Sequence, residues 1–137
     1  ARIEKFPSFV ERRKENFQYL YERLEKLGEK LILPTACPGS DPSWFGFLIT
    51  CKEGTDRNSL VRGLEEQGIQ TRMLFAGNLT KHPCFDEMRS LGKGYRIVGS
   101  LENTDRIMRD SFWIGVYPGM TKEMLDCMAD RIIELCS

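Results

Sequence analysis

The sequence has no excess of charge of either sign, no long apolar run and no closely spaced cysteines. Its 137 residues carry 20 basic and 20 acidic side chains, which argues against a general nucleic-acid binder, since such a protein needs surplus Lys and Arg against phosphate. No apolar stretch approaches the roughly 20 residues that cross a bilayer, and we expect no signal peptide at the start of the chain. The length fits one domain with a modest core.

Cysteine usage argues against a metal or cluster site within this chain. The five cysteines are Cys37, Cys51, Cys84, Cys127 and Cys136. No Cys-x-x-Cys or Cys-x-Cys pair occurs, so neither zinc nor an iron–sulfur cluster is expected here. An odd number of dispersed cysteines is typical of reduced thiols in a cytoplasmic protein. Cys51, Cys127 and Cys136 stand in apolar patterns and are predicted to be small core residues.

Motifs for catalysis are also missing. The sequence contains no Gly-x-Gly-x-x-Gly, Walker, Gly-x-Ser-x-Gly or His-Glu-x-x-His pattern. His82 is the single histidine, and a lone histidine before Pro83 in a loop is more typical of a surface or hydrogen-bonding residue than of a catalytic base. We therefore expect no catalytic residue in this chain.

Helical periodicity is the clearest pattern that is present. It predicts a long first helix from Phe6 to Leu27, with Ser8-Phe-Val-Glu11 as a capping box and Gly28 as the stop. A short helical turn is expected between Pro83 and Leu91. The expected caps of the other helices are Thr55 or Asp56, Asn103 and Thr121.

Three apolar runs predict strands, at residues 44–51, 69–75 and 111–116. The mixed pattern of the first run predicts burial on both faces, with Gly46 permitting a close approach. Core packing is the expected role of Trp113. The order helix, strand, helix, strand, short helices, strand, helix indicates a single two-layer α/β domain.

The segment Thr71–Pro83 is the strongest candidate for a ligand contact. An apolar run that begins beside Arg72 breaks at Gly77-Asn78 into a polar turn, and loops on rigid scaffolds often carry function. Arg72 is suited either to a ligand carboxylate or phosphate, or to an ion pair with Glu65 or Glu66. The Asn78 amide fits a turn by default and a sugar hydroxyl as the alternative. Trp44 is expected either in the core or as the wall of a pocket.

Several longer strings resemble one enzyme family. They are Gly68-Ile-Gln-Thr-Arg-Met-Leu-Phe-Ala-Gly-Asn-Leu-Thr80, Pro38-Gly-Ser-Asp-Pro-Ser-Trp-Phe-Gly-Phe47, Asn103-Thr-Asp-Arg-Ile-Met108, Phe112-Trp-Ile-Gly-Val-Tyr-Pro-Gly119 and Arg12-Arg-Lys-Glu-Asn-Phe17. Together they resemble the C-terminal small domain of the DegT/DnrJ/EryC1/StrS sugar enzymes, in the CDP-4-keto-6-deoxyglucose 3-dehydrase branch. The resemblance covers essentially the whole chain.

This resemblance implies a small domain of the type I, aspartate-aminotransferase fold, with residues 1–137 lacking the large cofactor-binding domain. It implies pyridoxamine or pyridoxal phosphate, a histidine base in place of the usual lysine, and a 2Fe-2S cluster, all held by the large domain. It also implies a CDP-sugar substrate, a reductase partner and a homodimer, in lipopolysaccharide O-antigen deoxysugar synthesis. The fragment alone is expected to be inert, and to expose apolar side chains around Phe6, Phe9 and Tyr21.

One departure from the family pattern separates its branches. Sugar aminotransferases of the family usually carry His-Tyr where this chain has Leu74-Phe75, and a further histidine at the position of Thr80. The resemblance therefore favours the dehydrase over its alternatives, a sugar aminotransferase small domain or a stand-alone partner-binding α/β module. The substrate-binding residues that it implies are Arg72, Phe75, Asn78, Trp44 and Ser43.

Overall fold

A four-stranded antiparallel sheet organises the molecule, in a computed structural model that describes residues 2–137. Its order is β1-β2-β4-β3. The strands are β1 (Leu31–Ile32), β2 (Gly46–Cys51), β3 (Thr71–Met73) and β4 (Ser111–Gly115). The sequence predicted three of them. It missed β1, whose two residues are too few to show a period and which forms by pairing Leu31 with Cys51.

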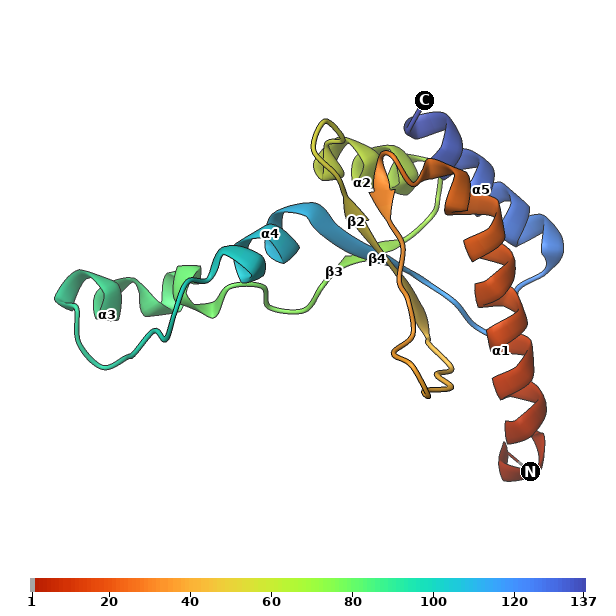
Figure 1. The fold of residues 1–137 in the computed structure, drawn as a ribbon, viewed down its shortest axis with the longest axis horizontal. Coiled ribbons are helices and arrows are strands. Elements are labelled where there is room, and N and C mark those ends of the chain that lie inside the picture. The colour runs from red at the N-terminus through yellow and green to blue at the C-terminus, as the bar shows by residue number, and fades with distance from the viewer. Residues whose placement is uncertain (1) are drawn as a thin grey trace.

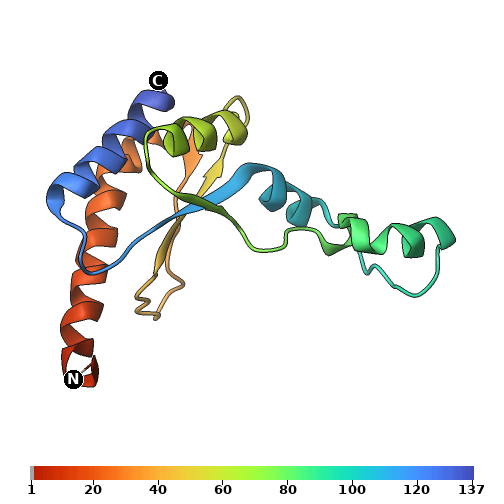
Figure 2. The same cartoon turned by 180° about the vertical axis from the view of Figure 1, so that it is seen from behind.

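Helices cover one face of the sheet and leave the other open. The helices are α1 (Arg2–Leu24), α2 (Arg57–Glu66), α3 (Asp86–Leu91), α4 (Glu102–Asp110) and α5 (Lys122–Leu135), with 3₁₀ turns at Glu25–Leu27, Leu79–Lys81 and Pro83–Phe85. α1 and α5 lie side by side against the sheet, and α2 packs beside α5 (Figures 1 and 2). α3 and the segments around it form an arm that reaches away from the sheet. The predicted two-layer α/β arrangement is confirmed.

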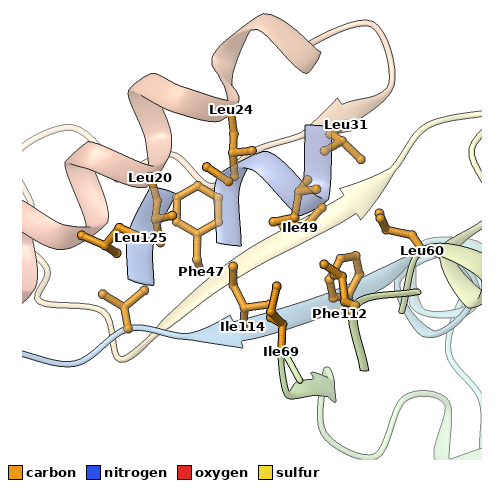
Figure 3. Packing of buried hydrophobic residues seen from close by; sticks show 14 of the residues in the cluster. Leu20, Leu24, Leu31, Phe47, Ile49, Leu60, Ile69, Phe112, Ile114 and Leu125 are labelled. Atoms are coloured by element: carbon orange, nitrogen blue, oxygen red, sulfur yellow. The ribbon is translucent and has the colours of Figure 1, made fainter. Parts of the chain in front are cut away.

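The core lies between these helices and the covered face. Along β2, Phe47, Ile49 and Cys51 are buried, whereas the residues between them face the open side. Burial of β2 on both faces was therefore a wrong expectation, because an antiparallel sheet can leave one face uncovered. Figure 3 shows the packing of Leu20, Leu24 and Leu125 over the covered face of the sheet. No helix within residues 2–137 combines the length and the apolar character that a membrane crossing requires.

Two of the predicted helix caps are correct and two are wrong. The Asp56 carboxylate accepts hydrogen bonds from the backbone N–H groups at the start of α2, and the Thr121 hydroxyl does the same for α5. Ser8 is no cap, because α1 already begins at Arg2 and the Ser8 hydroxyl donates to the Lys5 carbonyl. Asn103 lies inside α4, which begins at Glu102.

The exposure of individual apolar residues agrees with prediction in part. Phe6 is 64% and Phe9 is 46% exposed, as expected, whereas Tyr21 packs against the core. All five cysteines are free thiols, and Cys51 and Cys136 are buried. Burial raises the pKa of Cys51 to about 11, so this thiol stays protonated at neutral pH. Cys127 is exposed, against expectation, because it lies off the buried stripe of α5 that runs through Leu125 and Ala129.

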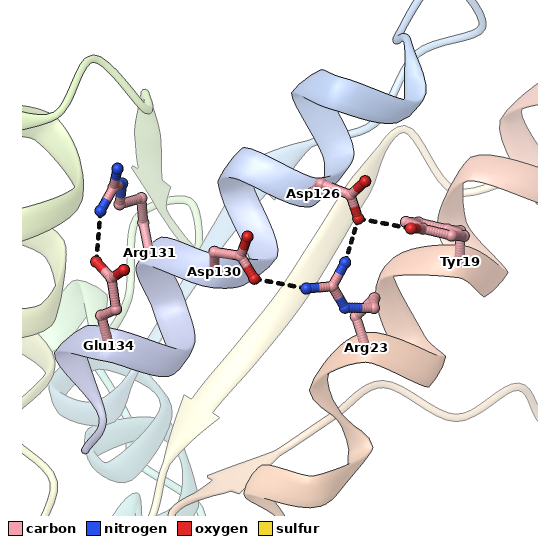
Figure 4. A network of polar contacts seen from close by, with 6 residues as sticks. All are labelled: Tyr19, Arg23, Asp126, Asp130, Arg131 and Glu134. Atoms are coloured by element: carbon pink, nitrogen blue, oxygen red, sulfur yellow. Dashed lines mark hydrogen bonds and ion pairs between the residues drawn. The ribbon is translucent and has the colours of Figure 1, made fainter.

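A polar network joins α1 to α5 outside the core (Figure 4). The Arg23 guanidinium pairs with both Asp126 and Asp130, and the Tyr19 hydroxyl donates to Asp126. These groups are about one-third exposed or more, so solvent screens them in part. The network therefore fixes how the two helices lie against each other more than it adds stability.

We expect Arg23→Met to lower the melting temperature by a few degrees at low salt and by less at high salt, because added ions screen the lost pairs. The matched control is Arg131→Met, which removes an ion pair to Glu134 within α5 alone. Thermal unfolding at two ionic strengths measures both variants. Equal, salt-independent losses would contradict a role for the pairing between helices.

Candidate functional site

An aromatic cleft occupies the open face of the sheet. It has a volume of about 470 Å³. Its walls are Ile32, Leu33, Pro34, Thr35, Trp44, Phe45, Gly46, Leu48, Thr50, Leu74, Phe75 and Trp113. These side chains come from β1, β2, β4 and the segment after β3, so the cleft brings together residues that are far apart in the sequence. We call the cavity lined by these twelve residues the aromatic cleft.

Trp113 lines both the aromatic cleft and a second groove. Register places it opposite Leu48 on β2 and Arg72 on β3, so the three side chains share the open face. Its ring meets Phe45 edge-on at 5.1 Å between centroids, and its indole N–H donates to the Met73 carbonyl. The ring lies directly over Gly46, where a Cβ would be 2.3 Å from Trp113 Cε3. The predicted close approach at Gly46 is thereby explained.

Phe75 stands at the edge of the aromatic cleft in an unusual backbone conformation. Its φ is +46°, the only positive value for a non-glycine residue within residues 2–137, and it is 80% exposed. The strand that was predicted at residues 69–75 is shorter in the structure, where β3 spans only Thr71–Met73. A bulky residue held in the left-handed region stores strain, which clusters at ligand-contacting segments.

Arg72 points to the second groove, which has a volume of about 790 Å³ and also contains Trp113, Tyr117 and Glu123. Arg72 is exposed and donates one hydrogen bond, to the Thr71 carbonyl at 2.9 Å. The alternative ion pair to Glu65 or Glu66 does not form in the described part of the chain. Glu65 instead accepts from Thr71, and these hydrogen bonds, with the Arg72 charge behind them, lower the pKa of Glu65. Most of the guanidinium is available to an anion.

Asn78 differs from Arg72 in being 2% exposed. Its side-chain oxygen accepts from the Thr80 N–H at 3.0 Å and from the Thr80 hydroxyl at 2.6 Å. Its amide nitrogen donates to Asp105 at 2.7 Å. The predicted turn at this position is present, as a capped 3₁₀ turn. Direct contact between Asn78 and a sugar stays a prediction, and in this structure the side chain holds the loop.

The remaining candidates lie at the borders of the site. Trp44 packs against Phe17, with ring centroids 4.8 Å apart and ring planes tilted by 44°, and it also lines the aromatic cleft, so both of its expected roles are combined. Among the described residues, the buried Ser43 hydroxyl has no hydrogen-bond partner. The His82 ring nitrogen Nε2 contacts the Ala76 carbonyl, which places it in the framework of the loop.

The residues that line the aromatic cleft do not fit the cofactors that the family resemblance implies. No lysine or histidine lines the aromatic cleft, and Thr35 and Thr50 are its only side-chain hydroxyls. This set suits a flat ring or an apolar surface and offers no cradle for a phosphate. Within residues 2–137, no group of three or more His, Cys, Asp or Glu side chains is placed to hold a metal ion.

Two residues of the site were missed from the sequence. Trp113 was assigned to the core, yet alternation along β4 sends it to the open face. Asp105 was noted only as part of a motif, although it accepts from Asn78 and pairs with Lys81 at 2.9 Å. Both bonds lower the pKa of Asp105, the one from Asn78 more strongly. Asp105 and Met108 are three residues apart, a spacing that puts them on one face of a helix. This spacing is the sequence signal that could have indicated their joint contact with another segment.

Comparison of the fold identifies the class of protein. The chain has a small α/β fold that matches part of solved structures with the pyridoxal-phosphate aminotransferase fold, with TM-scores near 0.8. The chain belongs to the DegT/DnrJ/EryC1/StrS aminotransferase family, whose model matches residues 1–133.

Relatives with known names support this assignment. The chain is 51% identical over 98% of its length to "Lipopolysaccharide biosynthesis protein RfbH" of Salmonella typhimurium. It is 43% identical, again over 98% of its length, to "dTDP-4-dehydro-2,6-dideoxy-D-glucose 3-dehydratase" of Saccharopolyspora spinosa. It spans only 30% and 28% of these two proteins.

The solved structures are more distant in sequence. GDP-4-keto-6-deoxy-D-mannose-3-dehydratase of E. coli, with bound hydrated PLP, superposes with a TM-score of 0.79 at 22% identity, over 95% of this chain and 32% of that one. DesV of S. venezuelae gives 0.80 at 20% identity, over 99% and 34%. At these identities the likeness concerns the fold alone.

Proposed function

We propose that residues 1–137 are the C-terminal small domain of a pyridoxamine-phosphate-dependent sugar-nucleotide 3-dehydrase. The enzyme would be cytoplasmic and act in the synthesis of O-antigen deoxysugars. The observation that carries the proposal is the 51% identity to RfbH over 98% of the chain. Leu74-Phe75, in place of the His-Tyr of sugar aminotransferases, supports the dehydrase branch.

The proposed reaction replaces the 3-hydroxyl of CDP-4-keto-6-deoxyglucose by hydrogen. The C3–O bond breaks and the oxygen leaves as water, while a reductase partner supplies two electrons through a 2Fe-2S cluster, with two protons from solvent. The pyridoxamine cofactor supplies an electron sink when it is bound. The aromatic cleft offers no cradle for a cofactor phosphate, and no group of described residues is placed to hold a metal ion. We therefore propose that both groups lie in another part of a larger, homodimeric protein.

This chain would supply one wall of the substrate site. We propose that the exposed Arg72 guanidinium binds an anionic group of the nucleotide sugar, since a fixed planar cation suits a phosphate. Phe75 and Trp44 would border the aromatic cleft against a ring of the substrate. The Ser43 hydroxyl is buried and has no hydrogen-bond partner among the described residues, so we place Ser43 at the edge of this wall, next to Trp44. Asn78 acts through the conformation of its loop.

The test is turnover by the full-length protein with pyridoxamine phosphate, a reductase and CDP-4-keto-6-deoxyglucose. We expect a 3-deoxy product, and no turnover by residues 1–137 alone. In the same assay Arg72→Ala should raise KM by about tenfold to a hundredfold, the range expected for a lost charge-assisted hydrogen bond.

The control variant is Arg62→Ala, an exposed arginine on α2 outside both cavities. An amino sugar formed from an amino-acid donor would instead establish the aminotransferase alternative. Turnover by the isolated chain would contradict the placement of the cofactor elsewhere. A KM unchanged by Arg72→Ala would remove this residue from the proposed site.

A further inference from the structure

The loop at residues 74–82 is held from the side of α4. Gly77 has φ +64°, and a Cβ there would lie 2.6 Å from Met108 Cγ. The Asn78 N–H points at the Met108 sulfur at 3.3 Å. The loop backbone therefore rests directly on the Met108 side chain, and only glycine allows this approach.

Asp105 holds the same loop one helical turn earlier. One oxygen, Oδ1, accepts from the Asn78 amide at 2.7 Å and from the Lys81 ammonium at 2.9 Å. Because Asn78 is almost fully buried and in turn binds Thr80 twice, the carboxylate orders the whole turn through one side chain. Residues three apart on a helix share a face, so Asp105 and Met108 form a single support for the loop.

The support matters because of what precedes it in the chain. Phe75 has positive φ and is 80% exposed, so packing of its own ring does not keep it in place. Its backbone is fixed from both sides: by the pairing of Arg72 and Met73 with β4 before it, and by the supported turn after it. Strained conformations persist only where the surroundings determine them.

We propose that Asp105 is a positioning residue for the proposed substrate site. With Met108 it fixes Asn78, and the ordered turn sets Phe75 at the rim of the aromatic cleft. Asp105 lies 27 residues after Asn78 in the sequence, so the arm between them serves to return α4 to the loop. This inference rests on the proposed function for the identity of the ligand, and on contacts within the chain for the support itself.

Two substitutions separate the contributions of Asp105. Asp105→Ala removes both hydrogen bonds, whereas Asp105→Asn keeps an acceptor for the Asn78 amide and loses the charge that pairs with Lys81. The control is Asp110→Asn, on the same helix, whose carboxylate pairs with Arg109 and forms no hydrogen bond or ion pair with residues 74–82. Each variant is made in the full-length protein.

Amide hydrogen exchange, resolved to short peptides, measures how firmly Asp105 holds the loop, and it requires no ligand. The N–H groups of Thr80, Lys81 and His82 are hydrogen-bonded within the turn. In Asp105→Ala we expect them to exchange at least tenfold faster, with β2 and α5 unchanged. Asp105→Asn should lie in between, and Asp110→Asn should match the parent protein. Unchanged exchange at residues 76–82 in Asp105→Ala would overturn the proposal, whatever the enzyme does.

Steady-state kinetics test whether the loop held by Asp105 positions the substrate site. KM for the nucleotide sugar should rise about tenfold in Asp105→Ala with a much smaller change in kcat, and Asp105→Asn should recover most of the loss. Faster exchange with an unchanged KM would overturn positioning, leaving only a structural contact. If the parent protein neither binds nor turns over a nucleotide sugar, the proposed function fails, while the exchange result still decides whether Asp105 holds the loop.

Discussion

Replacing Phe47 with alanine is expected to lower the free energy of unfolding by about 3–5 kcal/mol, the usual cost of emptying a buried aromatic site. Phe47 is fully buried on β2, with its ring 4.7 Å from that of Phe17 on α1. It therefore joins the sheet to the helical layer. Because small domains are stable by only about 5–15 kcal/mol, this one change removes a large share of the total.

Phe45→Ala is the matched control, two residues earlier in the chain. Phe45 precedes β2, is 59% exposed and lies on the open side of the sheet. We expect its loss to cost far less, since most of the ring is already in water. Denaturant unfolding of both variants, with the slope checked for constancy, measures the difference. Similar costs for the two variants would contradict the assignment of the covered face as the core.

Local sequence patterns predicted some elements of the fold and could not predict others. Long amphipathic periods predicted α1 and α5, and side-chain caps placed the starts of α2 and α5 at Asp56 and Thr121. A cap signal alone is weaker, as Ser8 shows: the same residue type inside a helix bonds back to a carbonyl of the preceding turn. β1 exists only through its pairing with β2, which local sequence does not encode.

The candidate site shows a similar division. The residue types at 72–82 marked a polar loop, and that loop is present beside the open sheet face. Whether each side chain faces a ligand depends on distant partners: Asn78 is buried because Asp105 meets it, and Arg72 is exposed because Glu65 binds Thr71 instead. Neither partner follows from local pattern. The sequence therefore indicated which segment matters, and the fold decided which of its atoms are available.

The open face depends on a close contact that one methyl group would break. At Gly46, an alanine Cβ would lie 2.3 Å from Trp113 Cε3 and 2.9 Å from Cζ3. The indole cannot easily retreat, since Phe45 packs on it edge-on and its N–H is bonded to Met73. We expect Gly46→Ala to cost about 1–3 kcal/mol of stability through overpacking, and to shift tryptophan emission as Trp113 moves.

Gly115→Ala provides an exact positional control, because Gly115 pairs directly with Gly46 across β2 and β4. Nothing lies within 4 Å of a Cβ built at Gly115. The two variants thus share a position in the paired strands and the loss of backbone freedom. Gly115 is the more exposed of the two, and only Gly46 is in close contact with Trp113. Denaturant unfolding and emission spectra should change in Gly46→Ala alone. Since Trp113 borders both the aromatic cleft and the Arg72 groove, that variant should also weaken binding of any ligand that spans the two.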